Sequence, residues 1–428
     1  MLRNPSIGLA TTLLLAACGP AGPAQPPIAS NASEASEASK PPVNYGAATP
    51  ATAQPFKIAP VASFDTPWAL AFLPDQRMLV TEKPGHLWLV TPAGVKTEVS
   101  GVPKVHFEGQ GGLLAVVTAP SFAQTRQIYL TYSEPGDGGD GLALARATLD
   151  SSTAQPTLKD VRVIWRQLPR GKGGQFGGYI TFSPDGRYLF LTSGERQRFT
   201  PAQDPDQALG KILRLTLDGK PAPGNPGAGK TGATTIGVID PPENTGAAAT
   251  AAVRTATMPS PNLTPAETWS TGHRNPYGLA FDSRGRLWET EMGPQGGDEL
   301  NLIEPGKNYG WPVVSYGKNY DDTPIAAHSG NAKYQQPVLY WNPIIAPAGL
   351  AFYRGNMFPE WQNSAFVGGL ASMALVRIDF DGAVPREAER WEMGARIRAV
   401  MAGPDGALWL LEDGPNGRLL RLTPKRAG

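Results

Sequence analysis

One phrase recurs along the chain and constrains the fold more than any other feature. It consists of a short strand, a turn of the Pro-Asp-Gly kind, a second strand, a loop, and a third strand ending in Leu, Val or Ile. Alternating apolar and small residues between turn residues are typical of short hairpins, and a diverged repeat indicates a fold built of similar units. The clearest copies are WALAFLPDQRMLVTEKPGHLWLV from Trp68, YITFSPDGRYLFLTSGE from Tyr179, YGLAFDSRGRLWETEMG from Tyr277 and IRAVMAGPDGALWLLEDGPNGRLLRL from Ile397, and weaker ones begin at Leu113 and Ala348.

Six copies predict an all-β chain folded as a six-bladed β-propeller, in which radial packing covers the edges of the sheets. The 50 glycines and 43 prolines favour turns over long helices. A β-sandwich followed by a second domain would account for the strands but not for their recurrence. Two segments fit no blade: residues 220–266 are predicted to be loop-like surface insertions, and residues 315–340 a lid or a metal-holding loop.

The N-terminal segment has the pattern of an export signal. Arg3 precedes the apolar run IGLATTLLLAA, which is too short to span a bilayer in the mature protein. The end of this run and the next residue form the tetrad Leu15-Ala16-Ala17-Cys18, which resembles a bacterial lipobox with Cys18 as the lipidated residue; an ordinary signal peptide with an incidental cysteine is the alternative. We therefore predict a signal peptide over 1–18, a disordered Ala/Pro/Ser-rich tether over 19–55 and the propeller over 56–425. The predicted location is the cell envelope, lipid-anchored at the outer membrane and facing the periplasm.

Position within the repeat predicts which residues meet. In a propeller the starts of the innermost strands gather at one end of the central channel, and the loops after the second strands rim the same end. The first phase holds polar and charged residues, namely Gln110, Gln175, Arg274, Asn275, Arg396 and Arg398. The second phase holds Glu82, Glu195, the turn Met292-Gly293-Pro294, Ala371 and Glu412.

Three arginines on one rim favour an anionic ligand, because the guanidinium fork matches carboxylate and phosphate. The alternative is a structural network in which these arginines pair with Glu82, Glu195 and Glu412. The 38 basic and 37 acidic side chains give no electrostatic reason to expect a nucleic acid as partner.

Residues 272–312 carry the most specific pattern in the chain. The turn at Met292-Gly293-Pro294 presents backbone carbonyls, and Asp298 and Glu299 offer carboxylates. Such oxygen donors suit Ca²⁺, whereas a solvated acidic turn is the alternative. Neighbouring residues of a strand point to opposite faces, so Asp298 and Glu299 are not expected to share one ion.

The motifs GHRNP, GP-x3-DE-x-N and NYGWP of this segment resemble those of the soluble quinoprotein glucose/sorbosone dehydrogenase family, the aldose sugar dehydrogenases that use pyrroloquinoline quinone (PQQ). The resemblance runs through nearly all of 56–425, with PAGLAF, QDPDQALGKILRL and RIRAV-x3-PDGALW as further matches. It implies a six-bladed propeller, which agrees with the repeat. It also implies oxidation of a sugar at its C1 hydroxyl, with PQQ and Ca²⁺ as cofactors and an electron acceptor that the sequence does not identify.

The resemblance assigns roles to individual residues. The positions that match contacts to the cofactor are Gln110, Arg274, Asn275, Arg396 and Arg398. The carbonyls of Gly293 and Pro294 match ligands of the cofactor-bound Ca²⁺, and Glu299 and Tyr309 match a second, structural Ca²⁺ site.

The chain departs from the family pattern at the chemistry. The histidine base of the family's H-F-G-G-R phrase is Gln175, its arginine is Tyr179, and the acid that supports the histidine is Glu195. A cofactor-binding lysine aligns with Ala371, or with Ser372 if the loop shifts by one. The usual glutamine before the Gly-Pro turn is Met292. An amide cannot accept a proton at neutral pH, and losing a general base costs about 10²–10⁴ in rate.

Three functions remain open from the sequence. The first is a PQQ- and Ca²⁺-dependent sugar dehydrogenase with altered catalysis, in which Glu195 is the candidate base and Gln175 occupies the base position. The second is a non-catalytic ligand-binding or interaction propeller, and the third a calcium-dependent lactonase, for which a cluster of arginines has no use. His106 is a further candidate base or an exposed loop histidine, and His273 is interpreted as a brace for the turn that follows it.

Overall fold

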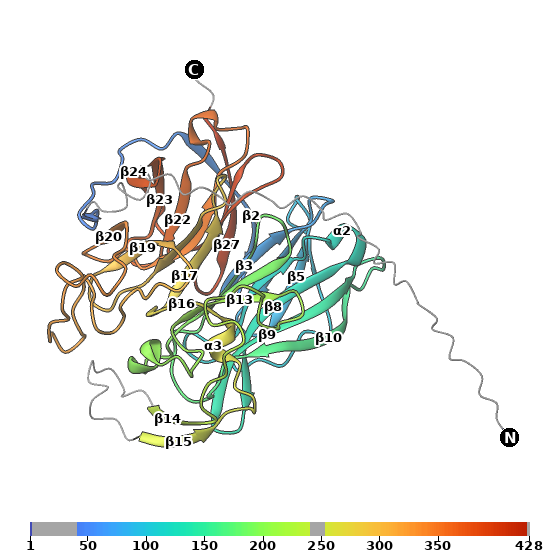
Figure 1. The fold of residues 1–428 in the computed structure, drawn as a ribbon. Coiled ribbons are helices and arrows are strands. Elements are labelled where there is room, and N and C mark those ends of the chain that lie inside the picture. Colours follow the sequence, from blue (N-terminus) through green and yellow to red (C-terminus); the bar gives the residue numbers. More distant parts are fainter. Residues whose placement is uncertain (2–40, 240–252, 426–428) are drawn as a thin grey trace.

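The computed structural model describes Met1 and residues 41–239 and 253–425. Within this part of the chain, six sheets of four or five strands form the blades of a β-propeller, and a separate two-stranded sheet lies outside them (Figure 1). The innermost strands of successive blades contact one another in a ring, and the sixth contacts the first. The prediction of an all-β, six-bladed propeller is therefore confirmed.

The blades follow one another in chain order, each running from the channel outward. Blade 1 consists of β3 (Pro67–Phe72), β4 (Met78–Glu82), β5 (His86–Val90) and β6 (Lys96–Glu98). Blade 2 consists of β7 (Leu113–Thr118), β8 (Gln127–Gly136), β9 (Gly139–Asp150) and β10 (Thr157–Arg166). Blade 3 consists of β11 (Gly177–Phe182), β12 (Tyr188–Ser193), β13 (Lys211–Thr216) and β16 (Thr268–Thr271). Blade 4 consists of β17 (Pro276–Phe281), β18 (Leu287–Glu291), β19 (Asp298–Ile303) and β20 (Leu339–Trp341). Blade 5 consists of β21 (Pro347–Phe352), β22 (Ala365–Gly369), β23 (Ala374–Asp381) and β24 (Val384–Glu392). Blade 6 consists of β25 (Ile397–Ala402), β26 (Leu408–Glu412), β27 (Gly417–Pro424) and β2 (Phe56–Phe64).

The last blade joins the two ends of the propeller. Strand β2 pairs antiparallel with β27, so the first and last segments of the propeller complete one sheet. The ring of Phe56 packs edge-on against Trp361 and Trp391, with centroids 6.1 and 5.3 Å apart. This pairing covers an edge that would otherwise expose unpaired backbone groups.

Residues 41–55 differ from the predicted tether. Strand β1 (Val43–Asn44) pairs in parallel with β20 and becomes the fifth strand of blade 4, and Tyr45 packs against that blade's core. The segment was not predicted to be ordered because it has few large apolar residues. Backbone hydrogen bonds hold it in place, together with Arg390, whose guanidinium donates to the Tyr45 carbonyl at 2.8 Å. The predicted signal peptide, Cys18 and the tether up to residue 40 lie outside the described residues. None of the described helices is long and apolar enough to cross a membrane.

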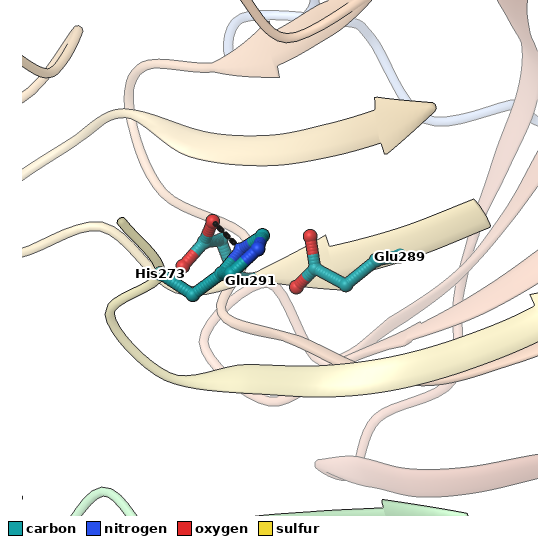
Figure 2. A group of neighbouring side chains, drawn as sticks. All are labelled: His273, Glu289 and Glu291. Carbon is teal, nitrogen blue, oxygen red and sulfur yellow. Dashed lines mark hydrogen bonds and ion pairs between the residues drawn. The ribbon is translucent and has the colours of Figure 1, made fainter. Parts of the chain in front are cut away.

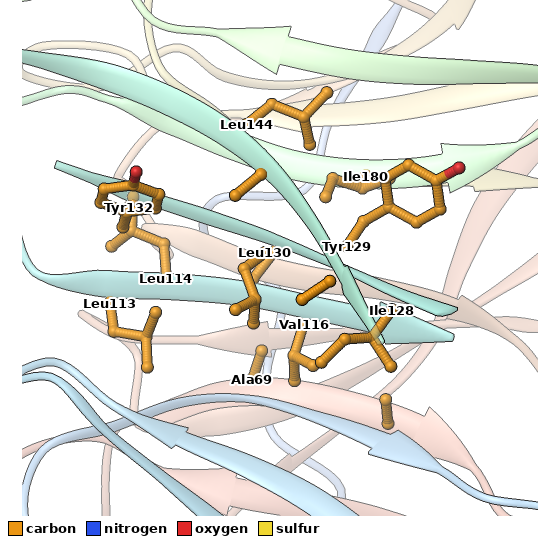
Figure 3. Close-up of a cluster of buried hydrophobic side chains, with 14 of the residues drawn as sticks. Ala69, Leu113, Leu114, Val116, Ile128, Tyr129, Leu130, Tyr132, Leu144 and Ile180 are labelled. Carbon is orange, nitrogen blue, oxygen red and sulfur yellow. The ribbon is translucent and has the colours of Figure 1, made fainter. Parts of the chain in front are cut away.

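The core lies between the faces of neighbouring blades. Figure 3 shows one such layer, where Leu114, Val116 and Leu130 of blade 2 lie between Ala69 of blade 1 and Ile180 of blade 3. Each blade is covered on both faces, so side chains on both sides of its inner strands are buried. This explains the near-continuous apolar runs of the repeat.

A bulge recurs near the start of every innermost strand. The pairing register shifts within the first four residues of β3, β7, β11, β17, β21 and β25. Bulges bend a strand and redirect side chains, and they are frequent beside binding sites. Here they lie at the end of the channel where the polar residues were predicted to meet.

The segment predicted as loop-like insertions contains regular structure. Strands β14 (Thr235–Ile239) and β15 (Val253–Thr257) form a hairpin, seen at the edge of the molecule in Figure 1, and helix α3 (Thr264–Glu267) follows. Ile236 and Val238 alternate along β14 and are buried, a short pattern that the surrounding Gly and Pro residues obscured. The other short helices are α2 (Phe122–Thr125), η1 (Thr200–Gln203) and η3 (Pro359–Trp361).

Candidate functional site

A cavity of about 330 Å³ lies at the rim where the innermost strands begin. The size falls at the lower end of the range for small-molecule sites. Its charged and polar lining includes Lys83, Gln110, Arg396, Arg398 and Asp413, together with Trp68, Tyr277 and Met292. Of the first-phase residues that were predicted to meet, Gln110, Arg396 and Arg398 line this cavity, whereas Gln175, Arg274 and Asn275 do not.

The acidic partner of the two C-terminal arginines is Asp413. Arg398 donates from Nε and Nη2 to Asp413 Oδ1 at 2.9 and 2.8 Å, and Arg396 Nε donates to Oδ2 at 2.8 Å. The pairing with Glu82 and Glu412 that we considered is wrong: Glu82 accepts from the Asp65 amide, and Glu412 pairs with Arg418. Nearby arginines lower the pKa of Asp413 against the effect of burial, so this carboxylate stays ionised.

Three aromatic rings from different blades pack together, and two of them, Trp68 and Tyr277, line the cavity. The ring centroid of Trp68 lies 4.7 Å from that of Tyr179 and 5.9 Å from that of Tyr277, and the two tyrosine centroids are 6.2 Å apart. The guanidinium of Arg398 lies 5.6 Å from the Tyr277 ring centroid. Tyr179, which stands where the family has an arginine, is therefore part of an apolar surface rather than of the charged rim.

Gln175 bridges a carboxylate and a guanidinium. In the amide orientation that satisfies both neighbours, its nitrogen donates to Glu195 Oε1 and its oxygen accepts from Arg274 Nη2 at 2.8 Å. Its backbone has φ 54°, a left-handed conformation that is uncommon for a residue other than glycine and is often found at functional sites. The backbone N–H of Gln175 donates to Gln110 Oε1 at 2.9 Å, and this hydrogen bond links Gln175 to a residue that lines the cavity.

Glu195 is fully buried behind Gln175. Its Oε2 accepts from the Arg198 and Phe199 amides, each at 2.5 Å, and Oε1 contacts the Gln175 amide. Burial raises the pKa of Glu195, and Arg274 opposes that shift. Both oxygens are engaged, so in this conformation Glu195 holds Gln175 rather than facing the cavity.

A buried arginine fixes the loop that carries Gln175. Arg196 is 0% exposed, donates to Gly173 O at 2.6 Å and Asp140 Oδ1 at 2.5 Å, and covers the Phe176 ring. The Asp140 carboxylate also contacts His106 Nδ1 at 2.7 Å. The His106 side chain is about half exposed. Its contact with Asp140 makes it part of the network that supports the Gln175 loop.

The Met-Gly-Pro turn is held from both sides. Arg274 Nη1 donates to the carbonyls of Met292 and Gly293 at 3.0 and 2.9 Å. Asp298 accepts from the Gly293, Ile345 and Ala346 amides at 2.7 to 2.9 Å, and burial raises its pKa to about 7. The Asn275 side chain contacts Met292 Sδ at 3.7 Å. A carbonyl oxygen has two lone pairs, so Gly293 could still offer one to a cation.

Three buried glutamates form a separate cluster behind this turn. Figure 2 shows Glu289, Glu291 and His273, whose ligand atoms lie within 4.8 Å of one another. Asn301 Nδ2 donates to Glu289, Glu291 and Glu299 at 3.0, 3.3 and 3.3 Å. Burial raises the pKa of Glu289, and repulsion from Glu291 adds to this effect. Glu289 Oε1 has no hydrogen-bond partner among the described residues.

The glutamate cluster has the chemistry of a cation site. A cavity of about 10 Å³, about the size of one water molecule, lies between Glu291, Glu299, Tyr309 and Gly293. Asp298 and Glu299 have separate partners, as their alternation along β19 predicted. His273 contacts Ser270 Oγ at 2.8 Å and Glu291 at 3.2 Å, and Glu291 also accepts from the Arg274 amide, so both residues brace the Arg274 turn.

The larger cavity of the channel lies at the opposite mouth. It measures about 1140 Å³ and is lined by the ends of the inner strands, including Phe72, Phe281 and Phe352. Its Asp282 is paired with Arg286, and Arg354 donates to a backbone carbonyl. The converging charged groups place the candidate site in the smaller cavity.

Sequence reasoning missed four residues of the site. Asp413 follows Glu412 directly and Lys83 follows Glu82, so a shift of one position in the second phase would have included both. Glu289 and Glu291 are two apart on a strand and therefore share a face. At the position of the family lysine, Ala371 and Ser372 donate backbone N–H groups to the Ile345 carbonyl and offer no charge.

A buried lysine beneath the Arg274 turn gives a testable pH dependence. Lys211 is 0% exposed and donates to the carbonyls of Pro201, Ala202 and Leu209 at 2.8 to 3.1 Å. Burial lowers its pKa to about 7 from 10.5. Between these values the unfolded chain holds a proton that the folded one releases, so the free energy of unfolding should rise with pH.

We expect the stability of the parent relative to Lys211→Met to increase from pH 7 to pH 10, measured by urea denaturation. The exposed Lys220, changed to Met, is the control and should show no such trend. A parent–variant difference that is constant with pH would contradict the assignment.

Comparisons with known proteins agree with this geometry. The family model described as Glucose / Sorbosone dehydrogenase matches residues 64–236 and 254–421. Aldose sugar dehydrogenase YliI of Escherichia coli (strain K12) is 40% identical over 371 residues, which cover 84% of this chain and 91% of that protein. The apo crystal structure of the soluble aldose sugar dehydrogenase from Escherichia coli superposes with a TM-score of 0.75 at 38% identity, covering 86% of this chain and 100% of that chain. The PQQ-bound aldose sugar dehydrogenase from Streptomyces coelicolor superposes with a TM-score of 0.66 at 28% identity, covering 88% and 100%.

Proposed function

The chain belongs to the glucose/sorbosone dehydrogenase family, and on that premise we propose that it binds PQQ in the rim cavity and oxidises the C1 hydroxyl of an aldose. The observation that carries the proposal is the convergence of Lys83, Arg396 and Arg398 on one cavity with aromatic walls. A flat molecule with three carboxylates is complementary to such a site. A PQQ-bound relative of known structure supports the choice of ligand.

The residues present fit this cofactor. Lys83, Arg396 and Arg398 line the rim cavity. Arg274, whose buried Nε lacks a hydrogen-bond partner among the described residues, lines the neighbouring cavity of about 10 Å³ and offers a further donor there. Gln110, Arg274, Asn275, Arg396 and Arg398 are the proposed contacts. When bound, PQQ would accept the hydride from C1 while the hydroxyl proton leaves to a base.

Calcium is proposed at two places. The carbonyls of Gly293 and Pro294 would hold the ion nearest the cofactor, with Gly293 offering the lone pair that its hydrogen bond from Arg274 leaves free. The second ion would lie by Glu299 and Tyr309, where burial raises the pKa of Glu299 and His328 opposes the shift. Three buried glutamates with few donors favour neutralisation by a divalent cation there.

The proton is the weak point of catalysis in this chain. Gln175 can orient a hydroxyl through its amide but cannot accept the proton. Glu195 could do so only if Gln175 moved and released Oε1. We therefore propose a slow enzyme in which Gln175 positions the substrate and Glu195 is the latent base.

The alternative is a propeller that binds the cofactor or another anion without turning over a sugar. The engagement of both Glu195 oxygens favours this alternative, because it leaves no free base at the site. A lipid-anchored, periplasm-facing location remains a further proposal, which rests on the sequence up to Cys18.

The test is sugar-dependent dye reduction by purified protein with PQQ and Ca²⁺. We expect slow reduction with aldoses, dependent on PQQ and lost when a chelator removes Ca²⁺. Bound quinone without dye reduction by any aldose would support the non-catalytic alternative. Failure to bind quinone at micromolar concentration would reject both the dehydrogenase and its cofactor site.

A further inference from the structure

Lys83 is a cation in the rim cavity that the family assignment does not account for. It follows β4 directly, is 9% exposed and lines the cavity beside Arg396 and Arg398. Its Nζ donates to the Gly109 carbonyl at 2.6 Å, and its backbone carbonyl accepts from the Leu113 amide at 3.0 Å. The first contact fixes the ammonium group at the cavity wall.

The charges around Lys83 do not balance. Asp413 is shared by Arg396 and Arg398, whereas Lys83 makes no ion pair with any of the described residues. The cavity lining therefore holds three cations and one carboxylate. Burial lowers the pKa of Lys83, and repulsion from Arg398 and Arg396 adds to this effect while Asp413 partly offsets it. A bound anion would remove the imbalance.

The shape of the cavity narrows the class of anion. Trp68 and Tyr277 present ring surfaces, and Gln110 offers an amide. Rings favour a flat ligand, whereas the cations favour carboxylates placed around its edge. A small spherical anion would leave the ring surfaces uncovered.

We propose that Lys83 binds a carboxylate of the flat polyanion in this cavity and so supplies, with Arg396 and Arg398, the third cation of its clamp. This inference rests on the proposed function, in which the polyanion is PQQ. The charge that Ala371 and Ser372 cannot provide would then come from the loop after β4, on blade 1 instead of blade 5.

The test is an equilibrium titration with PQQ in the absence of sugar, in which quenching of tryptophan fluorescence measures the bound fraction. Lys83→Met should raise the Kd by about ten- to hundredfold, as expected for losing one charge-assisted hydrogen bond. Lys83→Arg, which keeps the charge, should bind within a few-fold of the parent. Lys104→Met changes an exposed lysine of the loop leading to Gln110 and should leave the Kd unchanged.

A second ligand separates binding from a structural role, because Lys83 also ties down Gly109. The trimethyl ester of PQQ lacks the charges, so Lys83→Met should weaken binding of the acid much more than of the ester. Equal loss for both ligands, or a Kd like that of the parent, would overturn the inference. A parent that binds no PQQ would instead reject the proposed function itself.

Discussion

Replacing Gln175 by histidine should raise the rate of aldose oxidation by about 10²- to 10⁴-fold, the range expected for general-base catalysis. The imidazole would take the place of the amide beside Glu195 and give up the contact that the amide oxygen makes with Arg274. One ring nitrogen would donate to Glu195 Oε1, which fixes the tautomer, and the other would be free to accept the hydroxyl proton. The measurement is the initial rate of dye reduction with saturating PQQ and Ca²⁺.

The pH profile identifies the new base. With histidine at position 175 the rate should rise through a pKa near the ordinary imidazole value of about 6.5, a limb that the parent lacks. Gln197→His is the matched control: it places a histidine on the adjoining loop, where Gln197 contacts the Gly174 amide at 2.8 Å rather than Glu195. A Gln175→His variant no faster than the parent would show that the missing base does not limit the reaction.

Replacing Arg398 by methionine should weaken PQQ binding by about 2–5 kcal/mol, or roughly 30- to 5000-fold in Kd. Arg398 is 7% exposed, donates twice to Asp413 and lies against Tyr277, so its charge is held at a fixed place in the cavity. Its loss removes a contact to the ligand. It also leaves Arg396 as the one arginine of the described residues that pairs with Asp413, so that more of the negative charge of Asp413 acts on the ligand. Calorimetric titration with PQQ measures the effect.

Two further variants separate ligand binding from folding. Arg418→Met removes an arginine that pairs with Glu412 on the same rim but does not line the cavity, and it should bind PQQ as the parent does. In the double variant Arg398→Met with Asp413→Asn no carboxylate remains to repel the ligand, so part of the affinity should return. Unchanged binding in Arg398→Met alone would show that the quinone does not contact this arginine.

The architecture could be predicted from the sequence because it is written in a local, repeated pattern. Each copy of the phrase specifies its own hairpins, and six copies specify a closed ring. The closure by β2 and the added strand β1 could not be predicted, because the pairing partners of Val43 and Phe56 lie about 300 and 370 positions away. The β14–β15 hairpin was missed because only Ile236 and Val238 signal it amid Gly and Pro residues.

The site was predictable in position and less so in its contacts. Phase within the repeat placed Gln110, Arg396 and Arg398 on one rim, since every blade repeats the same geometry. Which acid pairs with which arginine depends on side-chain directions after a strand has ended, where alternation no longer applies, and so Asp413 was missed in favour of Glu412. The bridge between Glu195 and Arg274 through Gln175 likewise depends on the left-handed backbone at Gln175, which the residue type does not reveal.

The most direct test of the account is a crystal structure of the protein soaked with PQQ and Ca²⁺. The account predicts density for three fused rings in the cavity of about 330 Å³, with carboxylates at Arg396, Arg398 and Lys83. Quinone density at the opposite mouth of the channel, or an arginine pair still bound only to Asp413 with no ligand beside it, would contradict it.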